Sequence, residues 1–289
     1  MKKELIAEKN PKSPIAEIFR TLRTNIQFMN TQKSLKTVLI TSTMPGEGKT
    51  WIASNLAITF AQAGKKVVLI DADLRKGRLH KMFQTDAVPG LSNYLSGFDG
   101  NERIDNDDVF KYVKETEVGN LYIVPAGNFP PNPSELLTSE LTKIMIDRLK
   151  EVFDIIILDG TPCLLVSDSI ILSRIVDNTI LVAAHKTTKK DSLVKTKKAI
   201  ENVGGKISGI VLNKVPVNLD KYQSAYYYSS SSHKHESFKT QIEKYNYIDS
   251  IETKQNSSNN NLGKKENVTK DKTEDIMKQI DDFLKKNGK

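Results

Sequence analysis

The sequence predicts an α/β fold in which a mostly parallel sheet carries helices on both faces. Three observations predict it: short apolar segments rich in β-branched residues recur along the chain, longer segments of helical periodicity lie between them, and glycines stand at the junctions. Strands that alternate with helices favour right-handed βαβ units and a parallel sheet buried on both sides. The expected strands are residues 36–42, 66–75, 120–127, 154–160, 178–185 and 206–215.

Glycine and serine mark the ends of the expected helices. Residues 49–64 end at Gly64, residues 190–205 close on a pair of glycines, and Ser134 is expected to cap residues 134–153. Each of these segments follows an expected strand, as a βαβ unit requires.

The α/β pattern stops near Pro216. With this boundary, the chain has four expected parts. Residues 1–35 are expected to form an N-terminal helical region and residues 36–216 the main domain. Residues 217–236 form a tyrosine-rich segment. Residues 237–289 are polar, and because they hold too little apolar surface to fold alone, we expect a flexible C-terminal tail.

The composition limits the classes of function to consider. The net charge of +8 and the pI near 9.2 allow nucleic acid, an anionic membrane surface or a phosphate-bearing ligand as partner. Cys163 is the single cysteine, which excludes an internal disulfide and suits a reducing compartment. The N-terminus lacks the apolar core of a signal peptide, and no segment approaches the roughly 20 apolar residues of a membrane span. We therefore expect a cytoplasmic protein.

A glycine-rich turn, TSTMPGEGKT, joins the first expected strand to the first expected helix. Gly46 and Gly48 let backbone N–H groups face an anion, and the helix N-terminus adds positive partial charge. Lys49 is expected to reach the β- and γ-phosphates of a nucleotide, and Thr50 to offer its hydroxyl to Mg²⁺. Thr43 stands where such loops usually have their first glycine, so a coincidental glycine turn is the alternative. The strand–loop–helix context favours a phosphate loop and a P-loop NTPase-like fold.

Acidic residues end two of the expected strands. Asp159 closes DIIILDG and is placed to orient Mg²⁺ beside the phosphate loop. Asp71 and Asp73 follow another strand, where open α/β sheets bind ligands, and both are placed to hold a metal or polarise an attacking hydroxyl. The alternatives are a helix-capping role for Asp159 and a charged loop without a ligand for the other two.

These segments, in this order, resemble those of the bacterial tyrosine kinases of capsular and exopolysaccharide synthesis. The chain has MPGEGKT as Walker A, VVLIDADLR as Walker A′, IIILDGTP as Walker B, and then a tyrosine cluster. The stretches SPIAEIFRTLRTNIQF, PGLSNYLSG, PPNPSELL, SDS and GIVLNKVP match as well. The resemblance covers about residues 12–232.

The resemblance implies an ATP- and Mg²⁺-dependent protein-tyrosine kinase that autophosphorylates its tyrosine cluster in trans and regulates polysaccharide synthesis and export. The implied catalytic residues are Lys49, Asp71, Asp73 and Asp159, of which Asp71 is the best candidate to engage the acceptor hydroxyl. The implied ATP-binding residues are Gly46, Glu47, Gly48, Lys49, Thr50, Trp51 and Asn213. Thr50, Asp73 and Asp159 are the implied metal-binding residues. The implied acceptors are Tyr222, Tyr226, Tyr227 and Tyr228.

The resemblance also implies partners. Glu17, Arg20 and Arg23 match a pattern that mediates ring-like self-association in the family, although a solvated helix face is the simpler interpretation of this spacing. The family further implies a transmembrane adaptor of the polysaccharide chain-length regulator type, an opposing phosphotyrosine phosphatase, and a location at the inner face of the membrane through the adaptor. No nucleic-acid partner is expected.

Two features depart from the family pattern. Walker B usually continues as D-T-P-P, whereas Gly160 shifts the Thr–Pro pair by one position here. Residues 237–289 also continue well beyond the tyrosine cluster.

Two other classes of protein are alternatives. A Par/Min-type ATPase, a nucleotide-dependent positioning switch, shares the phosphate loop and the sheet, but its loop has an early lysine where Met44 stands here, and it lacks a terminal tyrosine cluster. A basic nucleic-acid-binding protein could use the tail aromatics for stacking, but the mixed charges of the tail argue against it.

Overall fold

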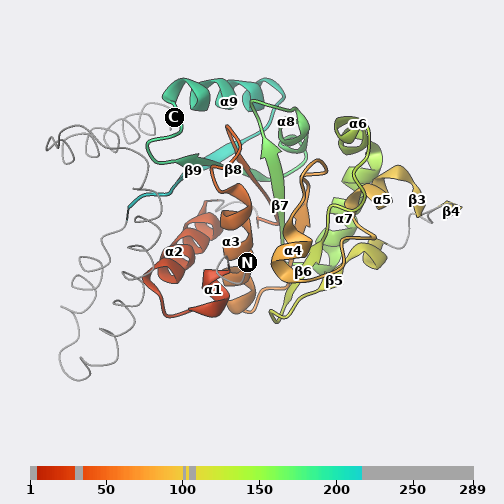
Figure 1. Cartoon of the computed structure of the whole chain (residues 1–289), viewed down its shortest axis with the longest axis horizontal. Helices are drawn as coiled ribbons and strands as arrows, with labels where there is room; N and C mark the ends of the chain where they lie inside the picture. The colour runs from red at the N-terminus through yellow and green to blue at the C-terminus, as the bar shows by residue number, and fades with distance from the viewer. Residues whose placement is uncertain (1–4, 30–34, 100–101, 104–108, 217–289) are drawn as a thin grey trace, which may run out of the picture. The chain divides into compact units, whose positions relative to one another are not determined.

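The computed structural model describes residues 5–29, 35–99, 102–103 and 109–216 (Figure 1). The tyrosine-rich segment, residues 217–236, and the expected flexible tail, residues 237–289, lie outside the described residues.

The predicted α/β fold with a mostly parallel sheet is confirmed. The sheet has the order β5-β6-β2-β7-β1-β8-β9, in which only β5 runs antiparallel to its neighbour. Its strands are β1 (Thr37–Ser42), β2 (Val67–Asp71), β5 (Lys114–Glu115), β6 (Leu121–Val124), β7 (Ile155–Pro162), β8 (Asn178–Ala184) and β9 (Ile207–Asn213). A separate pair joins β3 (Phe98–Asp99) to β4 (Glu102–Arg103). Because the six expected strands are parallel, all six end at one edge of the sheet, where ligands bind in open α/β folds.

Alternate residues of each central strand enter two separate cores. In β1, Val38 and Ile40 belong to one core and Leu39 to the other. The first core includes residues of α1 (Ile6–Lys9), α2 (Pro14–Phe28), α3 (Lys49–Gln62) and α4 (Leu79–Phe83). The second includes residues of α5 (Leu91–Ser96), α6 (Pro133–Thr138), α7 (Glu140–Val152), α8 (Asp168–Leu172) and the 3₁₀ helix Val109–Tyr112.

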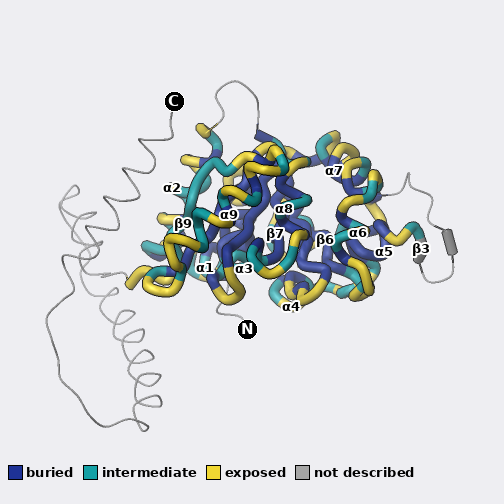
Figure 2. Tube along the Cα trace, turned by 90° about the horizontal axis from the view of Figure 1, so that it is seen from above, coloured by how far each residue is buried: buried dark blue, intermediate teal, exposed yellow. Residues whose placement is uncertain are grey.

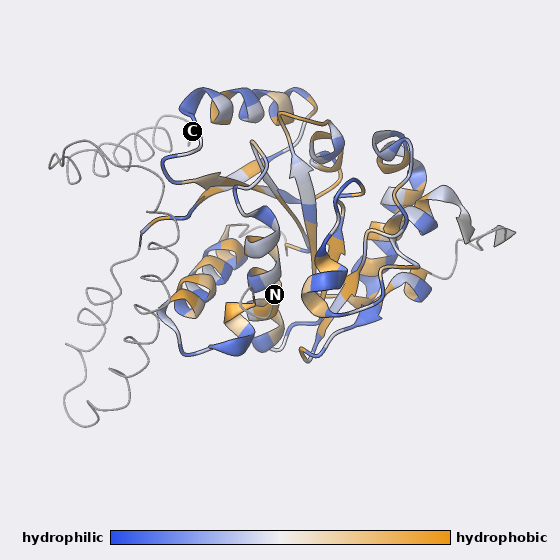
Figure 3. Cartoon of the chain, viewed as in Figure 1, coloured by the Kyte–Doolittle hydropathy of each residue, from blue (hydrophilic) through white to orange (hydrophobic). Residues whose placement is uncertain are grey.

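The two cores cover the central strands more completely than they cover β9, the strand at the edge of the sheet. The central strands are apolar and buried, whereas β9, which pairs with β8 and packs with α9 (Lys190–Asn202), is only half-buried (Figures 2 and 3). Within the described ranges, no helix combines the length and the apolar character that crossing a bilayer requires.

The N-terminal helices pack on the main domain. Phe19 and Ile26 of α2 are buried in the first core, and the ring of Phe19 meets the ring of Trp51 edge-on, with centroids 5.1 Å apart. The described part of the expected N-terminal region therefore shares its core with α3 (Figure 1).

The single helix expected over residues 134–153 is wrong in two respects. The structure has two helices, α6 and α7, separated at Ser139, whose extended backbone (φ −63°, ψ 152°) interrupts the helical turn. Ser134 does not cap a helix, because Asn132 occupies the N-cap of α6 and the Ser134 hydroxyl bonds to Asp168 instead.

A β-bulge in β7 accommodates the shifted Walker B sequence. Ile40 of β1 pairs with Asp159 and Ser42 pairs with Pro162, so β7 has one more residue than β1 over this interval. A Cβ atom at Gly160 would lie 2.3 Å from Ser169 Oγ, which leaves room only for glycine. The bulge therefore absorbs the extra residue after Asp159 and leaves that aspartate in register with β1.

Candidate active site

The phosphate loop adopts the backbone conformation that its glycines predict. Gly46 and Gly48 have φ angles of 79° and 98°, in the left-handed region that favours glycine, and α3 begins immediately afterwards at Lys49. A Cβ atom at Gly48 would lie only 2.1 Å from Asn213 Nδ2. Gly48 is thus required both by its backbone angle and by the approach of β9.

A buried carboxylate, Glu47, holds the phosphate loop in place. Its Oε2 accepts hydrogen bonds from the backbone N–H of Thr43 (2.7 Å) and of Met44 (3.0 Å). Its Oε1 accepts from the hydroxyls of Thr43 (2.9 Å) and Thr188, and its backbone carbonyl accepts from Asn213 Nδ2 (2.9 Å). We call these contacts the Glu47 network. The network explains why threonine replaces the usual first glycine, because Thr43 supplies two of the four donors to the carboxylate.

Replacing Glu47 with Gln should weaken nucleotide binding about tenfold, because an amide nitrogen would face donors where a carboxylate oxygen accepts, at a cost of about 1–3 kcal/mol. The dissociation constant of a fluorescent ATP analogue measures this effect, and a thermal melt reports folding. Glu151→Gln is the matched control, because Glu151 is exposed on α7. Unchanged nucleotide affinity in Glu47→Gln would show that the network does not shape the loop.

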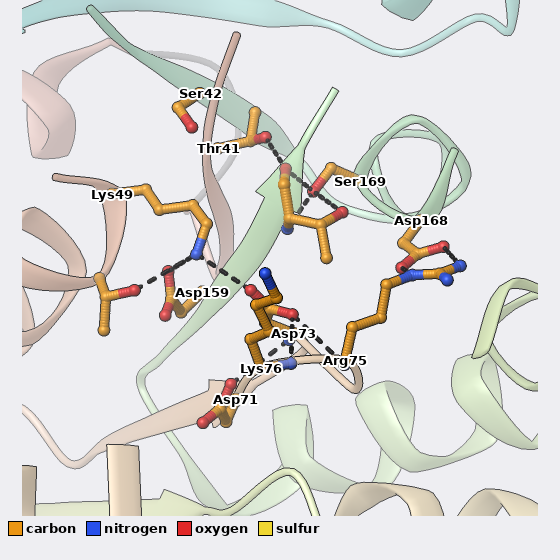
Figure 4. Close-up of polar contacts among 12 residues, drawn as sticks. Thr41, Ser42, Lys49, Asp71, Asp73, Arg75, Lys76, Asp159, Asp168 and Ser169 are labelled. Carbon is orange, nitrogen blue, oxygen red and sulfur yellow. Dashed lines mark hydrogen bonds and ion pairs between the residues drawn. The ribbon is translucent and has the colours of Figure 1, made fainter. Parts of the chain in front are cut away.

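Lys49 lies between two carboxylates, that of Asp73, just after β2, and that of Asp159, within β7 (Figure 4). Its Nζ is 3.3 Å from Asp73 Oδ2, 3.8 Å from Asp159 Oδ1 and 3.3 Å from the Thr50 hydroxyl. Burial alone would lower the pKa of Lys49, but the negative charges of Asp159, Asp73 and Asp71 outweigh it and raise the pKa. Lys49 is therefore a fully charged ammonium group in the folded protein.

Asp71 and Asp159 are almost completely removed from solvent. Asp71 accepts backbone N–H bonds from Asp73 (3.3 Å) and Leu79 (3.0 Å). Burial, reinforced by the charge of Asp159, raises the pKa of Asp71 to about 8. Burial also raises the pKa of Asp159, although the Lys49 ammonium opposes the shift. A bound divalent cation would favour the ionised forms of both groups.

An arginine–aspartate pair fixes the loop that carries Asp73. Arg75 donates from Nε to Asp168 Oδ2 (2.8 Å) and from Nη2 to Asp168 Oδ1 (3.0 Å), which is bidentate geometry (Figure 4). The Ser134 hydroxyl donates to Asp168 Oδ1 (2.6 Å) and accepts from Arg75 Nη2 (3.1 Å). Asp73 Oδ1 meanwhile accepts the backbone N–H of Lys76 (2.9 Å). The Asp73 loop is thus tied to both α6 and α8.

The structure brings most of the predicted site residues to the carboxyl edge of the sheet. The residues that meet there are Gly46, Glu47, Gly48, Lys49, Thr50, Asp71, Asp73, Asp159 and Asn213. Trp51 differs from them, because its ring packs on Phe19 at the contact between α2 and α3. The predicted acceptors, Tyr222, Tyr226, Tyr227 and Tyr228, lie outside the described residues.

The α2 residues predicted to mediate self-association have partners within this chain. Arg20 bonds to Glu17 and to the carbonyl of Pro11, and Arg23 Nη1 donates to the carbonyl of Thr59 (2.8 Å) in the last turn of α3. Their role between subunits stays a prediction.

The motifs assign no role at the site to three further residues, Asp168, Ser134 and Thr188. Asp168 and Ser134 lie in the matching stretches SDS and PPNPSELL, which is a signal for both, although Ser134 is expected there only as a helix cap. Thr188 has no such signal, because it meets the site only through the fold.

The parallel sheet, the phosphate loop and the adjoining carboxylates define a P-loop NTPase-like protein, a fold that implies nucleotide binding. A family model described as an AAA domain matches residues 35–207. The putative tyrosine-protein kinase CapB of Staphylococcus aureus is 39% identical over 224 residues, which cover 78% of this chain and 94% of that protein. The crystal structure of the chimerical protein CapA2B2 matches with a TM-score of 0.68 at 36% identity and covers 74% of this chain and 91% of the other. The chain belongs to the family of bacterial tyrosine-protein kinases.

The Par/Min alternative is related to this chain through the fold. The cell division ATPase MinD of Pyrococcus furiosus is 23% identical with a TM-score of 0.51, and the match covers 64% of this chain and 74% of that one. A likeness at this identity shows a common fold, whereas the family relationship places the chain among the tyrosine kinases.

The side chains at the site suit a nucleotide accompanied by Mg²⁺. Asp159 Oδ1 is buried without a hydrogen-bond partner among the described residues, as expected for an oxygen that awaits a further ligand. No group of three or more His, Cys, Asp or Glu side chains in the described ranges is arranged to hold a metal by itself. Mg²⁺ needs only one or two carboxylates when substrate phosphates and water complete its shell.

Proposed function

We propose that this protein is an ATP- and Mg²⁺-dependent protein-tyrosine kinase that phosphorylates its own tyrosine-rich segment in trans and regulates capsular or exopolysaccharide synthesis and export. The observation that carries the proposal is Lys49, held at the end of a phosphate loop between Asp73 and Asp159, in a chain of the bacterial tyrosine kinase family. A positioning switch of the Par/Min type would account for the phosphate loop. It would not account for the family relationship or for an acceptor segment rich in tyrosine.

In this proposal the phosphate loop and the N-terminus of α3 bind the nucleotide phosphates, and Asn213 lies near the base. Lys49 moves from the carboxylates to the β- and γ-phosphate oxygens and stabilises the charge that develops during transfer. Thr50, Asp73 and Asp159 hold Mg²⁺, which neutralises phosphate charge when bound.

The transfer breaks the bond between the γ-phosphorus and the bridging oxygen of ATP and forms a bond from that phosphorus to the tyrosine oxygen, which releases ADP. Asp71 is the proposed acceptor of the hydroxyl proton. Burial raises the pKa of Asp71 to about 8 in the metal-free site, and a bound divalent cation would favour the ionised form, which is the form that can accept a proton.

The acceptor assignment predicts the outcome of removing the hydroxyls of the tyrosine cluster. Replacing Tyr222, Tyr226, Tyr227 and Tyr228 together with Phe should reduce ATP-dependent phosphotyrosine on the chain at least tenfold. Each phosphate adds about −1.5 to −2 charge at neutral pH, so wild-type assemblies should also dissociate on incubation with ATP, while the variant stays assembled. Anti-phosphotyrosine blotting and size-exclusion chromatography measure the two effects. Strong labelling of the variant would move the assignment to other residues, with Tyr245 and Tyr247 the next candidates.

The family relationship supports partners beyond this chain. We propose a ring of subunits that uses Glu17, Arg20 and Arg23, a transmembrane adaptor of the chain-length regulator type that brings the kinase to the inner face of the membrane, and a cognate phosphotyrosine phosphatase. Pull-down with the cytosolic segment of a candidate adaptor, followed by a labelling assay, tests the adaptor.

A further inference from the structure

Two large apolar side chains stand exposed beside the candidate active site. Phe129 is 65% exposed and Leu165 is 57% exposed, on the loops that follow β6 and β7 respectively. In the sheet, β6 and β7 are the two neighbours of β2, whose end leads into Asp73. The two apolar side chains therefore lie on the loops to either side of the Asp73 loop.

Polar contacts fix these two loops to each other and to Arg75. Ser134, five residues after Phe129, bonds to Asp168 and Arg75. Ser167, two residues after Leu165, donates to the Ser134 hydroxyl (3.3 Å). Helices α6 and α8, which continue the two loops, pack against each other (Figure 1). These contacts hold in place the two loops that carry Phe129 and Leu165. We call these two side chains the rim.

The rim lies on the side of the site from which an acceptor must approach. The phosphate loop and Asn213 lie on the β1 and β9 side, and Lys49 lies between Asp73 and Asp159. In the proposed function, the γ-phosphate binds at Lys49. An acceptor hydroxyl that attacks in line from the far side of that phosphate enters over β2, between the loops of Phe129 and Leu165.

We propose that Phe129 and Leu165 form the docking surface for the tyrosine-rich segment, residues 217–236, and contact the aromatic rings that flank the tyrosine being phosphorylated. The inference rests on the proposed function and specifies its substrate recognition. The segment follows directly on Pro216, the last described residue, and its Tyr226, Tyr227 and Tyr228 are consecutive. Consecutive tyrosines place a ring on each side of the acceptor. Contact with exposed apolar side chains removes the large apolar surface of these rings from water, which favours binding.

The test measures binding and transfer separately, on the full chain. A fluorescent peptide of residues 221–236 is titrated for binding by anisotropy, and the same peptide serves as the acceptor with ATP and Mg²⁺. In the variant Phe129→Ser/Leu165→Ser we expect about tenfold weaker peptide binding and a KM for the peptide raised by a similar factor, with kcat and the KM for ATP within twofold of wild type. The control variant Phe28→Ser/Phe110→Ser changes two exposed phenylalanines on other parts of the fold and should match wild type.

A second peptide checks that the contact is with flanking rings. When the peptide carries Tyr226→Ala and Tyr228→Ala, wild type and rim variant should bind it equally weakly. Equal binding of the unmodified peptide by wild type and rim variant would overturn the inference. A rim variant that loses self-association or ATP affinity and still binds the peptide normally would overturn it too, and would assign the rim to a subunit interface or to the nucleotide. Rim-dependent binding without transfer in wild type would uphold the docking surface and contradict the kinase function instead.

Discussion

Replacing Lys49 with Met is expected to lower ATP-dependent labelling of the chain about a hundred- to a thousandfold. In the structure the Lys49 ammonium lies within ion-pair distance of both Asp73 and Asp159 at the end of the phosphate loop. Loss of one preorganised charge or donor in a water-excluded site typically costs this much in rate. The rate of phosphate incorporation from labelled ATP, at saturating nucleotide, is the quantity to measure.

The control for this experiment is Lys65→Met, which removes an exposed lysine just beyond α3 and should label like wild type. A thermal melt of Lys49→Met separates loss of catalysis from loss of folding, because the substitution leaves Asp71, Asp73 and Asp159 without their shared cation. Labelling of Lys49→Met at a rate close to that of wild type would contradict the role of Lys49 in the transfer.

Replacing Arg75 with Met is expected to lower the free energy of unfolding more than the other single replacements do. Asp168 is fully buried, and Arg75 supplies two of its hydrogen bonds. Breaking a buried pair by removing one partner costs about 3–5 kcal/mol. Because the Arg75 side chain is 36% exposed, we expect about 2 kcal/mol and a melting temperature lower by about 4–8 °C.

A double replacement isolates the reason for this loss. Arg75→Met/Asp168→Leu removes the stranded carboxylate as well, so it should be more stable than Arg75→Met alone. Arg148→Met is the control, because Arg148 and Glu151 form an exposed pair on α7 whose loss should cost less than about 0.5 kcal/mol. If Arg75→Met melts within 1 °C of wild type, roughly the change expected from a surface substitution, the pair does not stabilise the fold.

The strands and the phosphate loop could be predicted because their signals are local. The apolar run before Asp159 and the glycine spacing before Lys49 each specify one element without reference to the rest of the chain. The proximity of Asp71 and Asp73 could be predicted in the same way, because both residues stand at the end of one strand.

The remaining contacts of the site depend on residues far apart in the sequence. Ser134 has the type and position of a helix cap, yet its hydroxyl serves Asp168, 34 residues away. The Glu47 carboxylate is buried, and one of its partners is Thr188, 141 residues away. The break at Ser139 was missed because the apolar stripe of the segment continues across it. Such details follow from how loops from different strands pack at one edge of the sheet.

The central claim is that this chain transfers phosphate from ATP to its own tyrosines, and phosphosite mapping after incubation with ATP and Mg²⁺ tests it most directly. Mass spectrometry of the full chain should find phosphotyrosine at one or more of Tyr222, Tyr226, Tyr227 and Tyr228, and none after incubation without nucleotide. Consumption of ATP with release of inorganic phosphate and no phosphate bound to the protein would contradict the claim and identify a nucleotide switch instead.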